Sequence, residues 1–132
     1  MSYIPKYILK RMVPKDAVKK VENGIEIHMV NVISPLSIDD GIPDDAENHV
    51  NFKVNGEDLS PELKKQITFT LEGGDSYSIE NAKEFEGVVI PVGGKLVISA
   101  PVTNVEAGET HEFEVVIHTD NPFQVKIKRE VQ

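Results

Sequence analysis

Apolar and polar residues alternate with a period of two through the C-terminal segment 112–129, EFEVVIHTDNPFQVKIKR. This period is typical of strands that bury one face, and the central run Thr119-Asp120-Asn121-Pro122 is a turn signal. The segment therefore predicts an antiparallel hairpin. A three-residue loop would place two glutamates opposite Lys126 and Lys128 on the polar face, where opposite charges stabilise the pairing. The apolar face of this hairpin comprises Phe113, Val115, Ile117, Phe123, Val125 and Ile127.

Similar patterns upstream predict further strands, which lie at 25–33, 50–54, 67–71, 88–92 and 95–102. The Asn55-Gly56 pair is a strong turn signal between strands. Gly93-Gly94 predicts a two-residue hairpin that joins the last two of these strands, and Pro91 and Pro101 would place that hairpin at a sheet edge. With the C-terminal hairpin, the chain is expected to contain seven to nine short strands.

The N-terminal third is less regular. Segment 3–13 has an apolar stripe at helical spacing, but its β-branched and aromatic residues and the following Pro14 favour a strand. Segment 14–24 predicts a short helix or a helical turn, with proline at its first position and glycine at its end. Ser60-Pro61 predicts a second helical turn that reaches Lys65, with the serine as its cap.

Together these elements predict an all-β, single-domain antiparallel β-sandwich over residues 1–132, with one or two short helical turns. A sheet with one apolar face needs a second layer, and another sheet is the simplest choice. The spacing of the strands resembles that of immunoglobulin-like modules. The chain lacks the cysteine and tryptophan residues that mark true immunoglobulin domains.

Composition narrows the classes of protein. The sequence has 132 residues, which fits one domain with a sizeable core, and no apolar run approaches the length of a membrane span. It contains no cysteine, which excludes disulfides, thiolate metal sites and cysteine nucleophiles. Basic residues interrupt the apolar N-terminal stretch, so it does not resemble a secretory signal, and a cytoplasmic location is expected. An oxidising compartment is equally compatible with the absence of cysteine.

Charge is unevenly distributed. The net charge is −8, yet both ends of the chain are basic and the middle is acidic. The overall acidity argues against nonspecific binding of nucleic acid. If the two ends lie side by side, they would form a basic binding face, although a set of solvated lysines that maintains solubility is the alternative. The candidate binding residues are Lys6, Lys10, Arg11, Lys126, Lys128 and Arg129.

The longest predicted loop, 34–48, carries a cluster of carboxylates that offers the best candidate metal site. Several carboxylate oxygens in a flexible loop suit calcium or magnesium, but their order does not match the spacing of an EF-hand. A solvated loop with two turns is the alternative, because Asp and Gly favour turns. The candidate metal ligands are Asp39, Asp40, Asp44, Asp45 and Glu47.

Motifs for catalysis are missing from the sequence. The four histidines are scattered singly, and no nucleophile elbow or phosphate-binding glycine loop is present. We therefore expect a noncatalytic module that associates with itself or with another protein, partly because Val116 and the pair Val30 and Val32 are predicted on outer faces. Binding of a divalent cation or small ligand through loop 39–47 is the alternative. An enzyme that uses histidine and carboxylates between the sheets is the third hypothesis.

Overall fold

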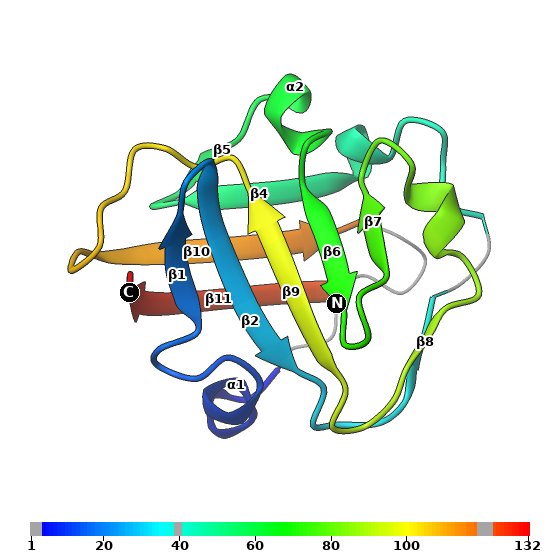
Figure 1. The fold of residues 1–132 in the computed structure, drawn as a ribbon, viewed down its shortest axis with the longest axis horizontal. Helices are drawn as coiled ribbons and strands as arrows, with labels where there is room; N and C mark the ends of the chain where they lie inside the picture. Colours follow the sequence, from blue (N-terminus) through cyan, green and yellow to red (C-terminus); the bar gives the residue numbers. More distant parts are fainter. Residues whose placement is uncertain (1–3, 39–40, 119–122) are drawn as a thin grey trace.

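The structure is a computed structural model that describes residues 4–38, 41–118 and 123–132. Two antiparallel sheets face each other, and their strands cross at a steep angle (Figure 1), as in orthogonal sandwiches. The all-β sandwich predicted from the sequence is confirmed. One sheet has the strand order β1 (Val18–Val21), β2 (Gly24–Val30), β9 (Lys95–Ala100), β6 (Thr68–Leu71) and β7 (Ser76–Ser78).

The second sheet has the strand order β11 (Phe123–Glu130), β10 (Thr110–Ile117), β4 (Val50–Val54) and β5 (Glu57–Asp58). A small third sheet pairs β3 (Leu36–Ser37) with β8 (Val89–Ile90). The helical elements are α1 (Lys6–Met12), η1 (Ala46–His49), α2 (Pro61–Lys64) and η2 (Ala82–Phe85). Neither α-helix of the described chain is long and apolar enough to cross a bilayer.

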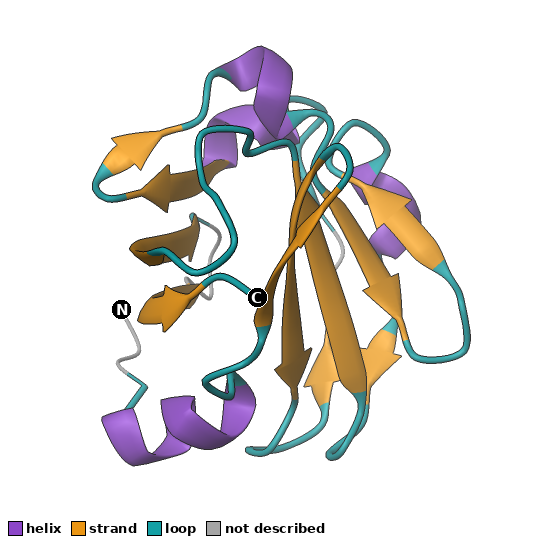
Figure 2. Ribbon diagram, turned by 60° about the vertical axis from the view of Figure 1, so that its left-hand side comes forward, coloured by secondary structure: helices purple, strands orange, loops and turns teal. Residues whose placement is uncertain are grey.

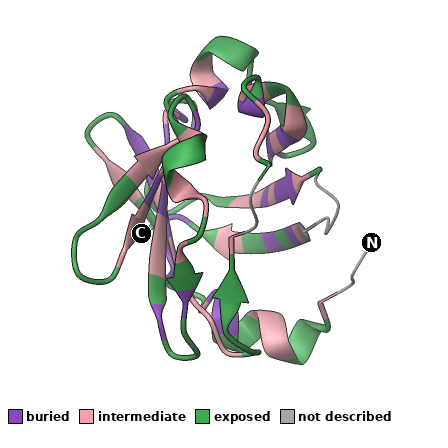
Figure 3. Ribbon diagram, turned by 90° about the vertical axis from the view of Figure 1, so that its right-hand side faces the viewer, coloured by how far each residue is buried: buried purple, intermediate pink, exposed green. Residues whose placement is uncertain are grey.

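The core lies between the two sheets, because alternate residues of both point inward. Phe52 of β4 and Phe113 of β10 are each 1 % exposed, and Ile25 of β2 is fully buried. Figure 3 shows buried stretches along the strands, whereas the surface of α1 is mostly exposed or intermediate. At Gly24 a side chain would collide with the Ala100 carbonyl oxygen, so the close approach of β2 and β9 requires glycine there.

The C-terminal hairpin is confirmed, with Glu112 paired to Lys128 and Glu114 paired to Lys126. Its turn, Thr119 to Pro122, lies outside the described residues. The predicted helical turn after Ser60 is also confirmed, because the Ser60 hydroxyl accepts a hydrogen bond from the Leu63 amide as the cap of α2.

Two predictions for the N-terminal third are wrong. Within the predicted strand, residues 6–12 form helix α1, because the apolar residues at helical spacing pack against the core, with Met12 only 5 % exposed. In segment 14–24 only a single turn is present at the start, where the Ala17 amide donates to the Pro14 carbonyl, and strand β1 replaces the predicted continuation to Gly24. Burial of Ala17 and Val18 against the core outweighs the helical signals there.

The predicted hairpin around Gly93-Gly94 is also wrong. Strand β8 pairs with β3, while β9 lies between β2 and β6 at the centre of its sheet. Pro101 follows β9 directly, so it ends a central strand instead of marking an edge. Val116, predicted on an outer face, is only 5 % exposed, while Val30 and Val32 are half-buried.

Candidate binding groove between helix α1 and strand β11

A groove of about 470 Å³ runs between α1 and the outer strand β11. Figure 2 shows the helix beside the end of the four-stranded sheet where β11 lies. The groove brings together residues more than a hundred positions apart in the sequence, because the first helix packs next to the last strand. It is lined by Ile4, Lys6, Leu9, Lys10, Glu112, Gln124, Lys126, Ile127, Lys128 and Arg129.

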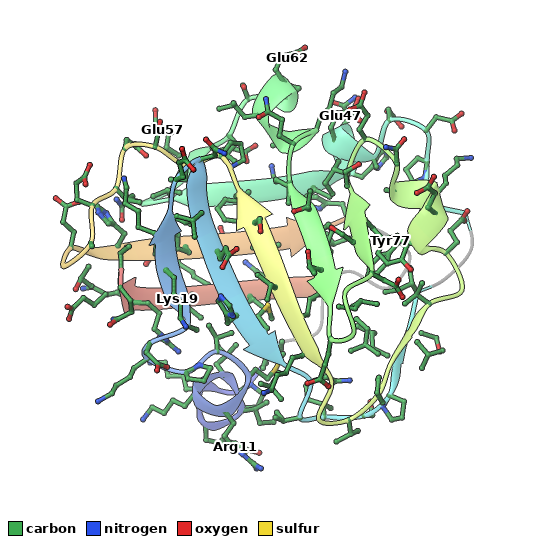
Figure 4. All side chains as sticks on the ribbon, viewed as in Figure 1. Arg11, Lys19, Glu47, Glu57, Glu62 and Tyr77 are labelled. Atoms are coloured by element: carbon green, nitrogen blue, oxygen red, sulfur yellow. The ribbon has the colours of Figure 1, made fainter. Side chains whose placement is uncertain are left out.

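Most of the basic face expected from the sequence is assembled here. Five of the six candidate binding residues line the groove, and Arg11 is the exception. Arg11 is exposed on the same helix and points away from the sheets at the end of the molecule (Figure 4). The predicted basic face required the two ends of the chain to lie side by side, and the described residues of α1 and β11 do so.

Arg129 has a structural role within this set. Its Nη2 donates to the Val13 carbonyl oxygen over 2.6 Å, and its Nε donates to the Pro14 carbonyl oxygen over 3.2 Å. Val13 is the cap at the C-terminal end of α1, where a cation also interacts favourably with the helix dipole. Desolvation by burial lowers the pKa of Arg129 from its ordinary value. Arg129 thus ties the C-terminal end of the helix to β11.

The lysines of the groove are available to an incoming ligand. Lys126 makes a long ion pair of 3.6 Å with Glu112, and both side chains are largely exposed, so this pair is weak. Among the described residues, no carboxylate lies within ion-pair distance of Lys6, Lys10 or Lys128. The rim of the groove therefore carries more positive than negative charge.

The wall and floor of the groove are partly apolar. Ile4 and Leu9 on the helix side are partly buried against the core, and Ile127 on the strand side is 5 % exposed. Apolar surface next to fixed charges is the usual composition of a site that binds an organic ligand or a peptide. The sequence interpretation missed these residues because it predicted a strand at 3–13. The stripe of Ile4, Ile8 and Met12 at helical spacing was the signal for the correct element.

The acidic loop shows no comparable convergence among its described residues. Asp44 pairs with Lys83 over 3.0 Å, and Asp45 interacts with Asn48 and with His49, the latter over 3.2 Å. The hydrogen bond from Asn48 is the main reason that the pKa of Asp45 lies below its ordinary value. Glu47 is half-buried in η1, whereas Asp39 and Asp40 lie outside the described residues.

No group of three potential metal ligands occurs in the part of the chain that the structure describes. Cation binding by the loop 39–47 stays a prediction, because two of its five candidate ligands are not described. The alternative of a solvated loop likewise stays open.

The histidines occupy separate local environments. His28 contacts Glu26 over 3.1 Å, His111 contacts Glu109 over 2.9 Å, and His118 contacts Asn51 over 2.6 Å. The hydrogen bond from His111 is the main reason that the pKa of Glu109 is lowered. Between the two sheets, a void of only about 10 Å³ with apolar walls is present. The described residues thus offer no histidine and carboxylate pair that faces a cavity between the sheets.

A second exposed apolar surface surrounds the small third sheet. Ile33, Leu36, Val89 and Val92 are each between 46 % and 55 % exposed. These residues line neither the groove nor the void between the sheets, so this surface does not indicate a particular ligand.

No known family of proteins matches this sequence, and no curated protein is detectably similar to it.

Proposed function

We propose that this protein is a noncatalytic β-sandwich module that works by association, and that its groove between α1 and β11 binds an acidic segment of a partner protein. The observation that supports this most strongly is the assembly of four lysines around an apolar-walled groove in a chain whose net charge is −8. A cytoplasmic location is part of the same proposal.

The charge distribution favours an acidic ligand at this groove. Lys6 and Lys10 come from the helix, and Lys126 and Lys128 come from the strand, so positive charge flanks the groove on both sides. Carboxylates dominate the opposite end of the molecule, where Figure 4 labels Glu47, Glu57 and Glu62. An acidic partner is repelled from that end and attracted to the groove, which orients its approach.

The apolar walls favour a protein segment over a small anion or nucleic acid. A phosphate or a nucleic-acid backbone needs only cationic and hydrogen-bonding groups, whereas Ile4 and Leu9 offer surface that only apolar groups can use. Nucleic-acid binding also needs a broader basic face than four lysines beside Glu112 provide. A segment that combines carboxylates with apolar side chains uses both parts of the groove.

A second copy of this chain is the alternative occupant. The basic end, which includes Arg11 and Lys19, and the acidic end lie on opposite sides of the molecule (Figure 4). Contact between unlike ends would be heterologous and would continue into chains of molecules. The excess of negative charge on every copy opposes this assembly, so we favour a separate acidic partner.

A direct test uses a fluorescein-labelled octapeptide of alternating glutamate and valine, with binding measured by fluorescence anisotropy. We expect saturable binding that weakens at least tenfold between 50 and 300 mM NaCl, because each neutralised charge pair is screened by salt. The double variant Lys126→Gln/Lys128→Gln should bind at least about tenfold more weakly, since about 1.4 kcal/mol corresponds to that factor.

The matched control is Lys83→Gln/Lys95→Gln, which removes the same charge from exposed positions outside the groove and should change affinity less than about twofold. Equal losses in both double variants, or no binding at millimolar peptide, would contradict the proposed groove. Sedimentation velocity of the protein alone measures whether it self-associates. A mass that rises with concentration and falls with salt would identify another copy as the occupant instead.

A further inference from the structure

Among the described residues, the backbone of β11 has an open edge, which follows from the hydrogen-bond pattern of its sheet. In an antiparallel pair, alternate residues direct both backbone groups toward the neighbouring strand and the residues between them direct theirs away. The Val131 amide donates to the Glu109 carbonyl oxygen over 2.8 Å, and the Asn55 amide donates to the Glu112 carbonyl oxygen over 2.7 Å. Both bonds, combined with the register of the strands, identify the same set of β11 residues as the ones that face β10. Val125, Ile127 and Arg129 bond to β10.

The residues between them therefore direct their backbone groups away from the sheet. These residues are Gln124, Lys126 and Lys128, whose side chains also lie on the outer face. Within the described residues, one of these groups has a partner, because the Lys128 carbonyl oxygen accepts from Nη1 of Arg129 over 2.8 Å. The amides of all three residues and the other two carbonyl groups make no hydrogen bond to the described chain.

The open part of the edge coincides with the groove. After the end of β11, strand β1 occupies this edge. The Gln132 amide donates to the Val18 carbonyl oxygen, and the Gln132 carbonyl oxygen accepts from the Lys20 amide. Gln124, Lys126 and Lys128 all line the groove. The helix α1 stands opposite them as a wall. An extended chain placed in the groove would meet unpaired backbone groups on one side and the apolar residues of the helix on the other.

We propose that the partner segment binds as an added antiparallel β-strand on the open edge of β11, with acidic residues opposite Lys126 and Lys128 and apolar residues toward Ile4 and Leu9. This inference rests on the proposed function and defines the chemistry of the partner: an extended segment with alternating acidic and apolar residues. Strand β10 already has this pattern, because it places Glu114 and Glu112 beside the same two lysines.

Charge also explains why the occupant is a different chain. A symmetric pair formed by two copies of β11 would bring Lys126 and Lys128 of each copy close to those of the other, and like charges opposite one another destabilise a strand pair. Lysine on an edge strand is a common protection against such self-pairing. An acidic strand has the opposite effect, since it forms cross-strand ion pairs with both lysines. The edge therefore favours pairing with an acidic segment and disfavours pairing with a second copy of β11.

The test uses two N-methylated forms of the alternating glutamate and valine octapeptide. In one form every glutamate amide carries a methyl group, and in the other every valine amide does. An antiparallel strand with its glutamates opposite Lys126 and Lys128 uses the glutamate amides as donors, so methylation there should weaken binding at least tenfold. Methylation of the valine amides, which point away, should weaken it less than about threefold. The reverse preference would overturn the antiparallel arrangement.

Amide proton exchange of the protein supplies an independent reading. The unmodified peptide should slow exchange at Lys126 and Lys128 at least tenfold and leave the exchange of Ile127 unchanged, because that amide already bonds within the sheet. If the unmodified peptide binds in a lysine-dependent way but both methylated forms bind equally and exchange at Lys126 does not slow, strand addition is overturned while the proposed function stands. If the unmodified peptide fails to bind, both proposals fall.

Discussion

The two edges of the four-stranded sheet are closed to different degrees. At the β5 edge, the Asp58 carboxylate accepts hydrogen bonds from the Phe52 amide over 3.0 Å, from Asn51 over 2.8 Å and from the Lys64 ammonium over 2.6 Å. The Asp58 side chain thus accepts the hydrogen bond that the Phe52 amide of β4 would otherwise donate to a neighbouring strand. At the β11 edge, the amides of Lys126 and Lys128 have no such partner among the described residues.

This difference shows that an edge can be closed without a long strand. Strand β5 has only two residues, and helix α2 supplies Lys64, which is 6 % exposed, to complete the cover. Helix α1 occupies the corresponding place next to β11, but the side chain of Arg129 anchors it by its C-terminal end and leaves a groove. The first edge stabilises the fold, and the second is the one at which we propose that a partner binds.

The largest expected effect is at the closed edge. Asp58→Ala removes a carboxylate that satisfies three donors and leaves the Lys64 charge buried without its partner. We expect the free energy of unfolding to fall by about 2 to 3 kcal/mol, measured by urea denaturation. The control Asp75→Ala changes an exposed carboxylate and should stay within about 0.5 kcal/mol of the wild type. Equal values for the two variants would show that Asp58 does not close this edge.

The second-largest loss of stability is expected when helix α1 loses its contact with Arg129. Arg129→Met keeps an unbranched apolar stem but removes the donors to Val13 and Pro14, so the free energy of unfolding should fall by about 1 to 2 kcal/mol. Amide exchange within α1 should accelerate as well, because the helix loses its anchor. Lys128→Met is the control at the neighbouring exposed position. A helix whose exchange is unchanged by Arg129→Met would refute the anchoring role.

Acid should weaken the closed edge selectively. Burial alone would raise the pKa of Asp58, but hydrogen bonds from Lys64, Asn51 and Phe52 outweigh it and hold the pKa below its ordinary value. The stabilisation from this lowered pKa is present above the pKa of the unfolded chain, near pH 4, and is lost as the pH falls through the lower value in the folded protein. The stability difference between wild type and Asp58→Asn should therefore shrink below pH 4. A difference that stays constant from pH 6 to pH 2 would argue against an ionised Asp58.

The open edge should tolerate change most readily. Lys126→Gln/Lys128→Gln removes exposed charges that make at most one weak ion pair to a described residue, so unfolding should shift by less than about 0.5 kcal/mol. The same variant is expected to lose peptide binding, as described above. Thermal denaturation of this variant next to Asp58→Ala compares the two edges directly. A loss of stability as large as that of Asp58→Ala would mean that the lysines support the fold.

Periodicity predicted the parts of the fold in which the hydrophobic pattern alone decides the structure. The β10–β11 hairpin is the clearest case, because each of its faces has one kind of residue and a shift by one position would expose the apolar set. The pattern at β9 predicted a strand but not its neighbours, because strand pairing depends on distant segments. The prediction of a strand at 3–13 was wrong because β-branched and aromatic residues favour a strand only weakly. Packing of Met12 on the core stabilises the helix instead.

The candidate site was partly predictable for the same reason. Charge counting identified the basic residues at both ends of the chain, and five of the six line the groove. The groove itself depends on the contact between Arg129 and Val13, which are 116 residues apart, and on the identity of α1 as a helix. The contact has no local signal in the sequence, whereas the helix has one in the spacing of Ile4, Ile8 and Met12.

Amide hydrogen exchange of the free protein, read residue by residue, tests the contrast between the edges most directly. The Phe52 amide, closed by Asp58, should exchange as slowly as the Ile127 amide inside the sheet. The Lys126 and Lys128 amides should exchange at least a hundredfold faster, as solvent-exposed groups do. Slow exchange at Lys126 and Lys128 in the absence of any ligand would show that the edge of β11 is already covered, and would contradict the proposed addition of a partner strand there.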